Sequence, residues 1–244
     1  MISVCIATYN GENFIKEQIQ SILKQLNPED EIIVSDDNSN DNTVKIINEL
    51  KDERITILHH KDSRNAIFNI DKSTWNFENA IKKAKGEYIF LSDQDDIWLD
   101  NKVNIFKKAL ECADVVMSDC IIVDDNKNTI CQSYFKSYRH FKKSIIYNII
   151  KPGFLGCCMA FNRNIIRHAI PFPSHGVAHD LWIGLTCLLH KYRFKFIEEK
   201  CMLYRRHNNT VTDSGKKNGT KLFFKTHYRL YILKAILKTK TRKS

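Results

Sequence analysis

The sequence predicts an α/β fold in which helices flank a mostly parallel sheet, with a basic helical tail at the C-terminal end. Two observations indicate this fold. Short runs of β-branched residues alternate with segments whose apolar residues recur at helical spacing, and polar turn-forming residues follow these runs. Strands that alternate with helices form parallel sheets covered on both faces, with right-handed crossovers. The 244 residues, 43% of them hydrophobic, fit one domain at residues 1–215 and an appendage at 216–244.

The first hundred residues predict four strands separated by three helices. We expect the strands at residues 2–8, 31–35, 55–58 and 88–91, and the helices at residues 15–26, 44–50 and 77–85. Asn27-Pro28 ends the first helix because proline cannot continue it, and Gly86 ends the third. Open α/β sheets bind ligands outside the carboxyl ends of their strands, so we expect the functional residues just after each strand.

Residues 101–215 follow a looser pattern and contain no internal repeat. We expect a helix at 102–112, a strand at 115–117, a hairpin turn at 124–128, a small-residue apolar run at 154–161, a helix at 181–189 and a strand at 194–197.

The positive charge of the protein is concentrated in the tail. Residues 216–244 hold ten Lys or Arg and no acid, whereas residues 1–215 hold 28 bases and 28 acids. A neutral body argues against nucleic-acid binding over the whole surface and favours a local anionic contact. The eight cysteines are scattered without a C-x-x-C pair and are expected to be reduced. The sequence contains no signal peptide or apolar membrane span, which predicts a cytosolic protein.

Three polar clusters follow the first, second and fourth expected strands: residues 8–10, 36–39 and 93–96. In a parallel sheet these ends share one edge, and the carboxylates gathered there would repel each other without a cation or donor hydrogens. Mg²⁺ and Mn²⁺ prefer such oxygen ligands, and Mg²⁺ combines one or two carboxylates with phosphate oxygens. The pattern therefore predicts Mn²⁺ or Mg²⁺ bound together with a diphosphate. Turn and cap formation is the alternative, and it suits Asn40 and Asp41, which precede a helix.

The three clusters resemble the motifs of the family 2 glycosyltransferases, which have a Rossmann-like GT-A fold. The resemblance is carried by residues 2–10, 36–39 and 86–96, and it runs through most of residues 1–210. It implies an inverting, metal-dependent transfer of a sugar from a nucleotide-sugar to an acceptor hydroxyl. It also implies that residues 1–100 bind the nucleotide-sugar and residues 101–215 bind the acceptor.

On the donor side, the resemblance assigns a role to each matching position. Thr8 and Asp37, with Asp36 beside them, match residues that hold the nucleotide base, and Tyr9 and Asn10 belong to the same site. Asp93 matches the first acid of the D-x-D motif, on the ribose or a metal-bound water, and Asp95 matches the acid that binds the metal. Many members have an Arg-Asn pair where Phe77-Glu78 stand here, and Asn76 or Asn79 is a possible substitute.

On the acceptor side, two segments resemble a bacterial surface-polysaccharide branch that is described as rhamnosyltransferase-like. They are the run that begins with Gly156 and Cys157, and His179-Asp180-Leu181-Trp182. Asp180 aligns with the catalytic base, which must lie across the pocket from the metal because inversion requires attack opposite the leaving group. His179 either orients this base or packs, and Trp182 is expected to be a wall or stacking residue. The alternative for Asp180 is a helix N-cap, which is compatible with catalysis.

Arg205, Arg206 and His207 resemble the segment that folds over the diphosphate. The two arginines are expected to neutralise the leaving group, and His207 is expected to complete the metal shell with Asp93 and Asp95. An exposed basic turn is the alternative interpretation.

The tail predicts a weakly amphipathic helix. Lys221, Lys225 and Arg229 form one helical stripe, and aromatic residues accompany the positive charge. We expect residues 216–244 to contact an anionic membrane surface, because the acceptors of such transferases are usually lipid-linked. The enzyme would then lie peripherally on the inner, cytoplasmic face of the cell membrane. A solvated tail, or one that contacts nucleic acid, is the alternative.

The sequence therefore predicts a hexosyl- or rhamnosyltransferase that uses a UDP- or dTDP-linked donor and a lipid-linked saccharide acceptor in surface-polysaccharide synthesis, without nucleic acid as a partner. A Mg²⁺-dependent nucleotidyltransferase is one alternative, although residues 8–12 lack its basic, glycine-rich phosphate loop. A non-catalytic module that binds carbohydrate or nucleic acid is the other.

Overall fold

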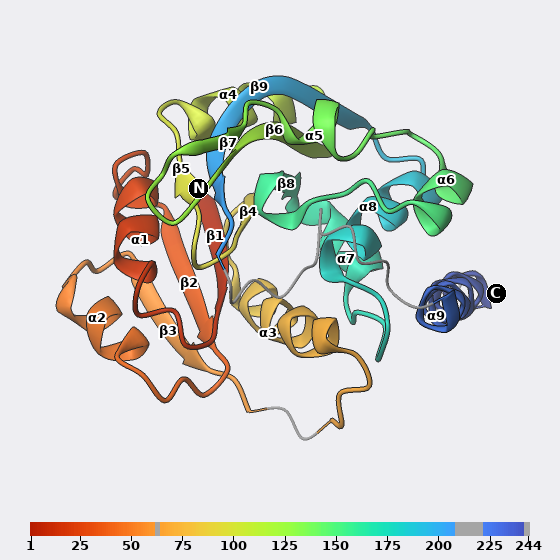
Figure 1. Ribbon diagram of the computed structural model, residues 1–244, viewed down its shortest axis with the longest axis horizontal. Helices are drawn as coiled ribbons and strands as arrows, with labels where there is room; N and C mark the ends of the chain where they lie inside the picture. Colours follow the sequence, from red (N-terminus) through yellow and green to blue (C-terminus); the bar gives the residue numbers. More distant parts are fainter. Residues whose placement is uncertain (62–63, 208–221, 242–244) are drawn as a thin grey trace.

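The computed structural model describes residues 1–61, 64–207 and 222–241, including the side chains of residues 226–239 in the last helix. Its centre is a nine-stranded sheet with the strand order β3-β2-β1-β4-β8-β6-β9-β5, and β7 pairs with β6 (Figure 1). The first half contains β1 (Ile2–Thr8), α1 (Ile15–Leu23), β2 (Glu31–Asp36), α2 (Thr43–Glu49), β3 (Ile55–His59), α3 (Asn69–Lys83) and β4 (Tyr88–Ser92).

The second half adds shorter strands and helices around the continuing sheet. It contains β5 (Ile97–Trp98), α4 (Lys102–Leu110), β6 (Val115–Val123), β7 (Thr129–Cys131), α5 (Tyr134–Ser137), α6 (Ile145–Ile150), β8 (Met159–Asn162), α7 (Ile166–Ala169), α8 (His179–Leu189), β9 (Phe194–Arg205) and α9 (Leu222–Thr241). Single 3₁₀ turns at Gly156–Cys158 and Arg163–Ile165 flank β8.

The order in which strands are added across the sheet reverses within its parallel half. The chain runs outward from β1 to β2 and β3 and then returns to place β4 on the other side of β1, and all three pairings are parallel. Because right-handed crossovers place helices according to this direction, α1 and α2 lie on one face and α3 on the other (Figure 1). Neighbouring strand ends therefore open a crevice between β1 and β4, which is where such sheets bind ligands.

The expected elements of the first half are present, and the sheet interior explains their sequence pattern. Val4, Ile6, Ile33 and Val34 are at most 1% exposed because helices cover both faces of the sheet. Each such side chain contributes about 1.5–3 kcal/mol through burial, which is why the strands appear as continuous apolar runs rather than alternating ones.

One expected helix begins earlier than its apolar pattern indicates. α3 starts at Asn69, not Phe77, because its first two turns are largely polar and their order depends on Asp71. The buried Asp71 carboxylate accepts hydrogen bonds from the backbone N–H groups of Ile67 and Phe68 and from Gly176 N–H. A tertiary contact with residue 176 therefore fixes the start of the helix.

The second half of the sheet is mixed, and two of its strands are longer than expected. β8 is antiparallel to both β4 and β6, and β9 runs parallel to β6 and antiparallel to β5. β6 continues to Val123 and β9 to Arg205, past their apolar runs, because the two strands pair along their lengths despite register shifts. This pairing brings Arg205 and the residues after it back to the carboxyl end of β4 through β5.

The last helix packs against the body of the protein. Ile232 is fully buried in α9, and Ala235 and Ile236 are nearly so. The stripe expected from Lys221, Lys225 and Arg229 is only partly observable, because residues 216–221 and the Lys225 side chain lie outside the described residues. Among the described residues, no helix combines the length and hydrophobicity needed to span a bilayer.

Candidate active site

The ends of β1 and β2 are joined through Asp36. The carboxylate of Asp36 accepts hydrogen bonds from Thr8 Oγ1 at 2.9 Å, Ser39 N–H at 2.9 Å and Ser39 Oγ at 2.6 Å. Thr8 and Asp36 are each 1% exposed. Both oxygens of the Asp36 carboxylate are therefore hydrogen-bonded within the protein. Asp36 is buried beneath the crevice and stabilises the loop after β2.

Asp37 is placed differently, because its carboxylate is partly open to solvent. One oxygen lies 2.9 Å from Nδ1 of His60, and the side chain keeps 23% of its surface exposed. The neighbouring backbone is fixed by Asp37 N–H, which donates to the Thr8 carbonyl. Asn76 in α3 donates to the same carbonyl, and its buried Oδ1 has no hydrogen-bond partner among the described residues.

The loops after β1, β2 and β4 are tied together by amide side chains. Gln94 accepts from Tyr9 N–H at 2.9 Å and donates to the Tyr9 carbonyl at 3.1 Å, while the Tyr9 ring stays exposed. Asn10 accepts from Asn40 N–H at 3.0 Å. Gly11 lies so close to Gln94 that a Cβ would be 2.5 Å from Oε1, so this clamp requires a glycine. Gln94 is a functional position that the sequence pattern did not single out.

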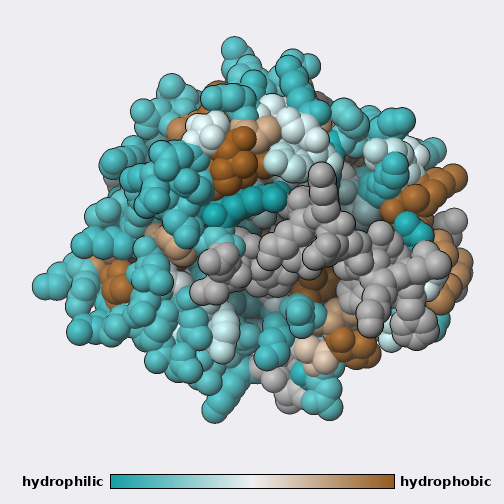
Figure 2. Space-filling view, viewed as in Figure 1, coloured by the Kyte–Doolittle hydropathy of each residue, from teal (hydrophilic) through white to brown (hydrophobic). Residues whose placement is uncertain are grey.

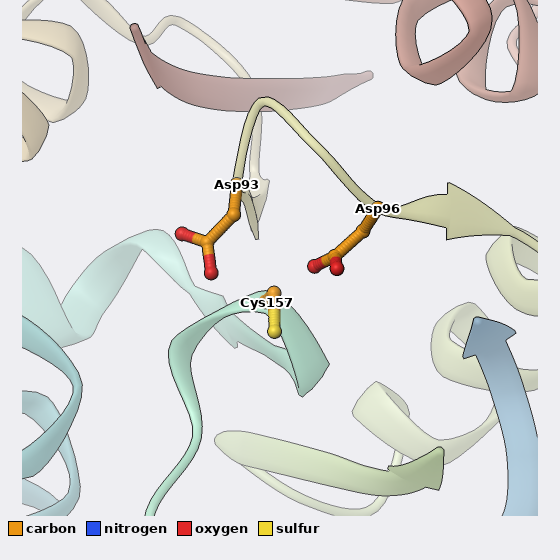
Figure 3. A group of neighbouring side chains, drawn as sticks. All are labelled: Asp93, Asp96 and Cys157. Carbon is orange, nitrogen blue, oxygen red and sulfur yellow. The ribbon is translucent and has the colours of Figure 1, made fainter. Parts of the chain in front are cut away.

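Asp93 and Asp96 face a common space with the thiol of Cys157 (Figure 3). One oxygen of each carboxylate and the Cys157 sulfur lie within 4.8 Å of one another. Burial, followed by the charges of Asp95 and Asp180, raises the pKa of Asp93 to about 7. Burial and the neighbouring Asp95 and Asp93 likewise raise the pKa of Asp96 well above its usual range. The hydrogen-bond donors around Asp93 and Asp96 therefore do not fully compensate the negative charge of the carboxylates at this edge of the sheet.

Asp95 meets His207 on the open side of this cluster. His207 Nε2 lies 2.7 Å from Asp95 Oδ2, and the imidazole packs on Phe14 with a centroid separation of 4.7 Å. The two side chains come from the loop after β4 and from the end of β9, more than a hundred residues apart in the chain. Only the family resemblance predicted that Asp95 and His207 belong to one site. In the structure, the two side chains are in direct contact.

The donor atoms at this edge fit a divalent cation. Among the described residues, the ligand atoms that lie together belong to Asp93, Asp96 and Cys157, which differs from the expected set of Asp93, Asp95 and His207. The carboxylate oxygens suit Mg²⁺ and Mn²⁺, and the His207 nitrogen beside Asp95 suits transition metals better than Mg²⁺. In addition, Asp96 is 1% exposed and its Oδ2 has no hydrogen-bond partner among the described residues. An orphaned, buried carboxylate oxygen beside two further carboxylates is the environment that a bound cation would relieve.

Asp180 lies close enough to this cluster for its charge to affect Asp93. It is the second residue of α8, whose N-cap is Ala178, so Asp180 is not the cap residue itself. Its Oδ2 accepts from Gly156 N–H at 3.2 Å and its Oδ1 from its own neighbour Leu181 N–H at 2.6 Å. Its charge contributes to the raised pKa of Asp93, so the two carboxylates share one electrostatic environment although they come from different halves of the chain.

His179 is buried beside this carboxylate without using its ring nitrogens. Its imidazole stacks on Phe77 with a centroid separation of 4.0 Å, and neither nitrogen has a hydrogen-bond partner among the described residues. Burial lowers the pKa of His179, so the ring is neutral at pH 7. Gly156 provides the space, because a Cβ there would lie 2.6 Å from His179 Nε2. A neutral imidazole can both donate to and accept from a sugar hydroxyl.

Two expected ligand contacts, those of Trp182 and Arg205, are changed by the structure. Trp182 is 2% exposed and donates from Nε1 to the Ala169 carbonyl, so it belongs to the core rather than to an acceptor wall. Arg205 is 3% exposed, and its guanidinium donates to the Asp95 and Asp125 carbonyls and to Glu17. These bonds hold the Arg205 guanidinium within the protein, so it is not available for the diphosphate contact expected from the sequence.

Arg206 keeps part of its hydrogen-bonding capacity. Its guanidinium lies 5.2 Å from the centroid of the Tyr138 ring, and its buried Nη2 has no hydrogen-bond partner among the described residues. The rest of the basic segment predicted to cover the diphosphate, from residue 208 onward, lies outside the described residues.

A buried lysine that was not predicted from the sequence contacts the backbone of Cys157, next to the acidic cluster. Lys102 is fully buried, donates from Nζ to the Cys157 carbonyl at 2.8 Å, and lies 4.3 Å from the centroid of the Trp98 ring. Burial lowers the pKa of Lys102, while the nearby cysteines and Asp96 oppose this shift. No periodicity distinguishes this lysine from a surface residue at a helix start, so only its tertiary position identifies it.

Comparison with known proteins places these residues in a family context. The family model described as Glycosyl transferase family 2 matches residues 3–169. The dTDP-rhamnosyl transferase RfbG of Shigella flexneri is 25% identical over 240 residues, covering 92% of this chain and 77% of the relative. WfgD of Escherichia coli, a UDP-Glc:alpha-D-GlcNAc-diphosphoundecaprenol beta-1,3-glucosyltransferase, is 26% identical over 187 residues, covering 76% of this chain and 69% of the relative.

The fold also matches a solved structure. The crystal structure of Staphylococcus aureus TarS 1–349 in complex with UDP-GlcNAc superposes with a TM-score of 0.66 at 21% sequence identity. The match covers 86% of this chain but 60% of that chain, so the present sequence spans less than two thirds of TarS 1–349. The mostly parallel sheet flanked by helices is therefore a GT-A fold.

Proposed function

Because the chain belongs to glycosyl transferase family 2, we propose that it transfers a sugar from a nucleotide-sugar to an acceptor hydroxyl with inversion at the anomeric carbon. The observation that carries this proposal is the meeting of carboxylates from both halves of the chain. Asp93 and Asp95 follow β4, Asp180 begins α8, and the charges of Asp95 and Asp180 both raise the pKa of Asp93.

We assign the donor nucleotide to the carboxyl ends of β1 and β2 beside α3, next to the crevice between β1 and β4. Asp37 offers a partly exposed carboxylate and Asn76 offers an unpartnered amide oxygen, both suited to the N–H groups of a base. Tyr9 supplies an exposed ring next to them, while Thr8, Asn10 and Asp36 hold the loops in place. The similarity to RfbG and WfgD supports a dTDP- or UDP-linked sugar.

Asp95 and His207 would hold the divalent cation, with Asp93 beside them, and Mn²⁺ suits this mixed set of oxygen and nitrogen ligands better than Mg²⁺. A cation bound there supplies charge neutralisation for the departing nucleoside diphosphate. Arg206 adds a guanidinium with a free donor on the same side, and Arg205 fixes the Asp95 backbone through its carbonyl. The residues thus concentrate positive charge where the leaving group develops negative charge.

Asp180 is the proposed base. Inversion requires the acceptor oxygen to approach from the face opposite the diphosphate, and Asp180 comes from the second half of the chain, close enough to Asp93 to influence its pKa. The N–H groups of Gly156 and Leu181 fix the orientation of its carboxylate, and His179 offers a neutral ring to a neighbouring sugar hydroxyl. In this arrangement Asp180 accepts the proton of the attacking hydroxyl as the new glycosidic bond forms.

We further propose a lipid-linked saccharide as the acceptor, in the synthesis of a bacterial surface polysaccharide. The printed activity of WfgD on a diphosphoundecaprenol-linked sugar supports this acceptor class. An acceptor of this kind is confined to a bilayer, so the enzyme would work as a peripheral protein at the cytoplasmic face of the cell membrane.

The proposal is tested by separating binding from transfer. Asp180→Asn should reduce kcat by at least about 100-fold and leave the Kd of the nucleotide-sugar within about threefold, because the base contacts only the acceptor. Asp95→Ala should instead abolish the Mn²⁺-dependent part of donor binding. The measurements are isothermal titration of UDP- and dTDP-sugars with and without Mn²⁺, and thermal shift as a check of folding.

The exposed Asp100→Asn is the matched control, and it should change neither property. If Asp180→Asn and Asp95→Ala lose donor binding and transfer to the same degree, the division of roles is wrong. If no nucleotide-sugar raises the melting temperature of the wild-type protein, the proposed function itself fails.

A further inference from the structure

Exposed apolar side chains gather on two helices at one edge of the molecule. In α6, Ile146 is 72% exposed and Ile150 is 50% exposed, and in α9 Leu230, Leu233 and Leu237 are also exposed. Figure 2 shows hydrophobic side chains at the right-hand edge of the molecule, where Figure 1 places α6 and α9. Exposed apolar side chains that gather on neighbouring helices are candidates for an interaction site.

Helical geometry places these side chains on one continuous face. Ile146 and Ile150 are four residues apart, and Leu230, Leu233 and Leu237 follow i, i+3, i+7, so each set lies on one side of its helix. The two helices are joined where Arg229 Nη2 donates to the Ile150 carbonyl at 3.1 Å. We name these five residues the α6/α9 face: Ile146, Ile150, Leu230, Leu233 and Leu237.

The α6/α9 face is bordered by positive charge. Lys142, Lys143 and Lys151 flank α6, and Lys234 and Lys238 are exposed beside the leucines of α9. The sequence contains no acidic residue from 126 to 179 or from 214 to 244, the segments that supply both helices. An apolar stripe with lysines on its margins, and without acids in the same segments, is complementary to an anionic lipid surface.

The opposite side of α9 faces the proposed catalytic base. Ile232, Ala235 and Ile236 pack into the body, and the environment of Tyr228 includes the Ala178 backbone and the charge of Asp180. α9 therefore carries apolar side chains on two faces, one buried and one exposed, with Lys234 and Lys238 beside the exposed one. A bilayer on the exposed face would lie one helix away from Asp180.

We propose that the α6/α9 face docks on the surface of an anionic phospholipid bilayer, with its isoleucines and leucines inserted among the headgroups. This surface differs from the stripe that the sequence predicted in the tail, because Arg229 of that stripe is bonded to α6. The docking itself is independent of the reaction, whereas its use in presenting a lipid-linked acceptor to Asp180 rests on the proposed function.

The test is sedimentation of the full chain with vesicles made of equal parts phosphatidylglycerol and phosphatidylcholine, compared with phosphatidylcholine alone. The wild-type protein should bind the anionic vesicles, and added salt should weaken binding. Leu233→Ser with Leu237→Ser, and separately Lys234→Glu with Lys238→Glu, should each reduce the vesicle partition coefficient by roughly tenfold or more. Donor binding should stay unchanged in both variants, since none of these residues lies in the site.

Matched controls test whether position matters. Ile67→Ser with Ile130→Ser removes two equally exposed isoleucines elsewhere, and Lys45→Glu with Lys108→Glu reverses two exposed lysines elsewhere. The first control should keep wild-type vesicle binding, and the second should lose much less than Lys234→Glu with Lys238→Glu.

Two results would overturn the proposal. The first is equal vesicle binding by the wild type and the α6/α9 variants. The second is a wild-type dimer, seen by analytical ultracentrifugation, that the leucine variants dissociate while anionic vesicles bind neither form. In that case a second copy of the chain occupies the face. Loss of vesicle binding with intact transfer to a soluble acceptor would leave the proposed function standing and support the docking role.

Discussion

At the scale of single residues, the site holds buried carboxylates whose negative charge destabilises the protein when no cation is bound. Asp93 has a pKa of about 7 in the fold, against about 3.9 in an unfolded chain. Between these two values the unfolded chain has already released a proton that the folded chain retains. Asp93 therefore lowers the stability of the metal-free protein as the pH rises from about 4 to about 7, and the penalty is complete above that range.

This linkage predicts a stabilising substitution at the site. In metal-free buffer at pH 8, Asp93→Asn should raise the stability by roughly 1–2 kcal/mol, which corresponds to about 3–6 °C in melting temperature. The advantage should shrink as the pH is lowered toward 4. Thermal melts across this pH range measure it, with Asp100→Asn as the neutral control. An Asp93→Asn protein less stable than the wild type at pH 8 would mean that donors within the protein already satisfy the carboxylate.

Gly156 leaves the space that His179 and Asp180 occupy, so a larger residue there should disturb both side chains. A methyl group at this position would meet His179 Nε2 at 2.6 Å and Asp180 Cβ at 3.3 Å, so Gly156→Ala must displace one of them. A shift of about 1 Å in a reacting group costs on the order of 100-fold in rate. We expect kcat to fall by about that factor, while donor affinity stays within about threefold.

Gly153→Ala is the matched control for this prediction, because a Cβ there meets only the Asn148 amide oxygen, at 3.2 Å, and more distant atoms of Phe141. It should retain most of the transfer rate. Steady-state kinetics on both variants, with circular dichroism to verify folding, make the comparison. Equal rates for the two variants would show that the space beside His179 is not required.

At the scale of elements, the strands and helices that follow from the local pattern of apolar and polar residues were predicted from the sequence. β1, β2 and β4 are buried on both faces, so each is a short apolar run that ends in polar residues, whereas β3 at the edge of the sheet is only partly buried. The shared edge formed by the strand ends follows from parallel topology. β9 shows where this reasoning stops. Three charged residues, 198–200, interrupt its apolar runs, and its length is set by pairing with β6, which sequence periodicity does not contain.

The same distinction holds within the site. The acids after β4 were predictable because strand and motif are contiguous, and the family resemblance supplied Asp180 and His207. The contacts that decide the role of each side chain were not predictable. Arg205 and Arg206 are adjacent and chemically identical, yet Glu17 and two carbonyls bind the first and leave a donor of the second unpaired. Only the tertiary fold separates them.

At the scale of the whole molecule, the basic segment and the catalytic domain are physically continuous. The sequence divides the chain at residue 215, because positive charge begins there. In the structure, α9 buries Ile232, Ala235 and Ile236 against the body, and the Tyr231 ring meets Phe68 edge to face at a centroid separation of 5.4 Å. Phe68 immediately precedes α3, so α9 contacts an element of the first hundred residues.

This continuity predicts the effect of removing α9. A chain that ends at residue 221 loses two buried isoleucine side chains and the edge-to-face contact between Tyr231 and Phe68, a loss of about 3–5 kcal/mol after the entropy of ordering the helix is considered. The melting temperature should fall by at least about 6 °C. Transfer to a soluble acceptor should also slow, because Tyr228 lies beside the Ala178 backbone and Asp180.

A chain that ends at residue 239 is the control, because it keeps every buried side chain of α9 and removes two lysines and an arginine near the end of the chain. It should melt within about 1 °C of the full chain. If the chain that ends at 221 melts at the same temperature as both, α9 is an independent tail, as the charge pattern alone suggests. If it melts lower but transfers sugar to a soluble acceptor at the full rate, α9 stabilises the fold without shaping the acceptor side of the site.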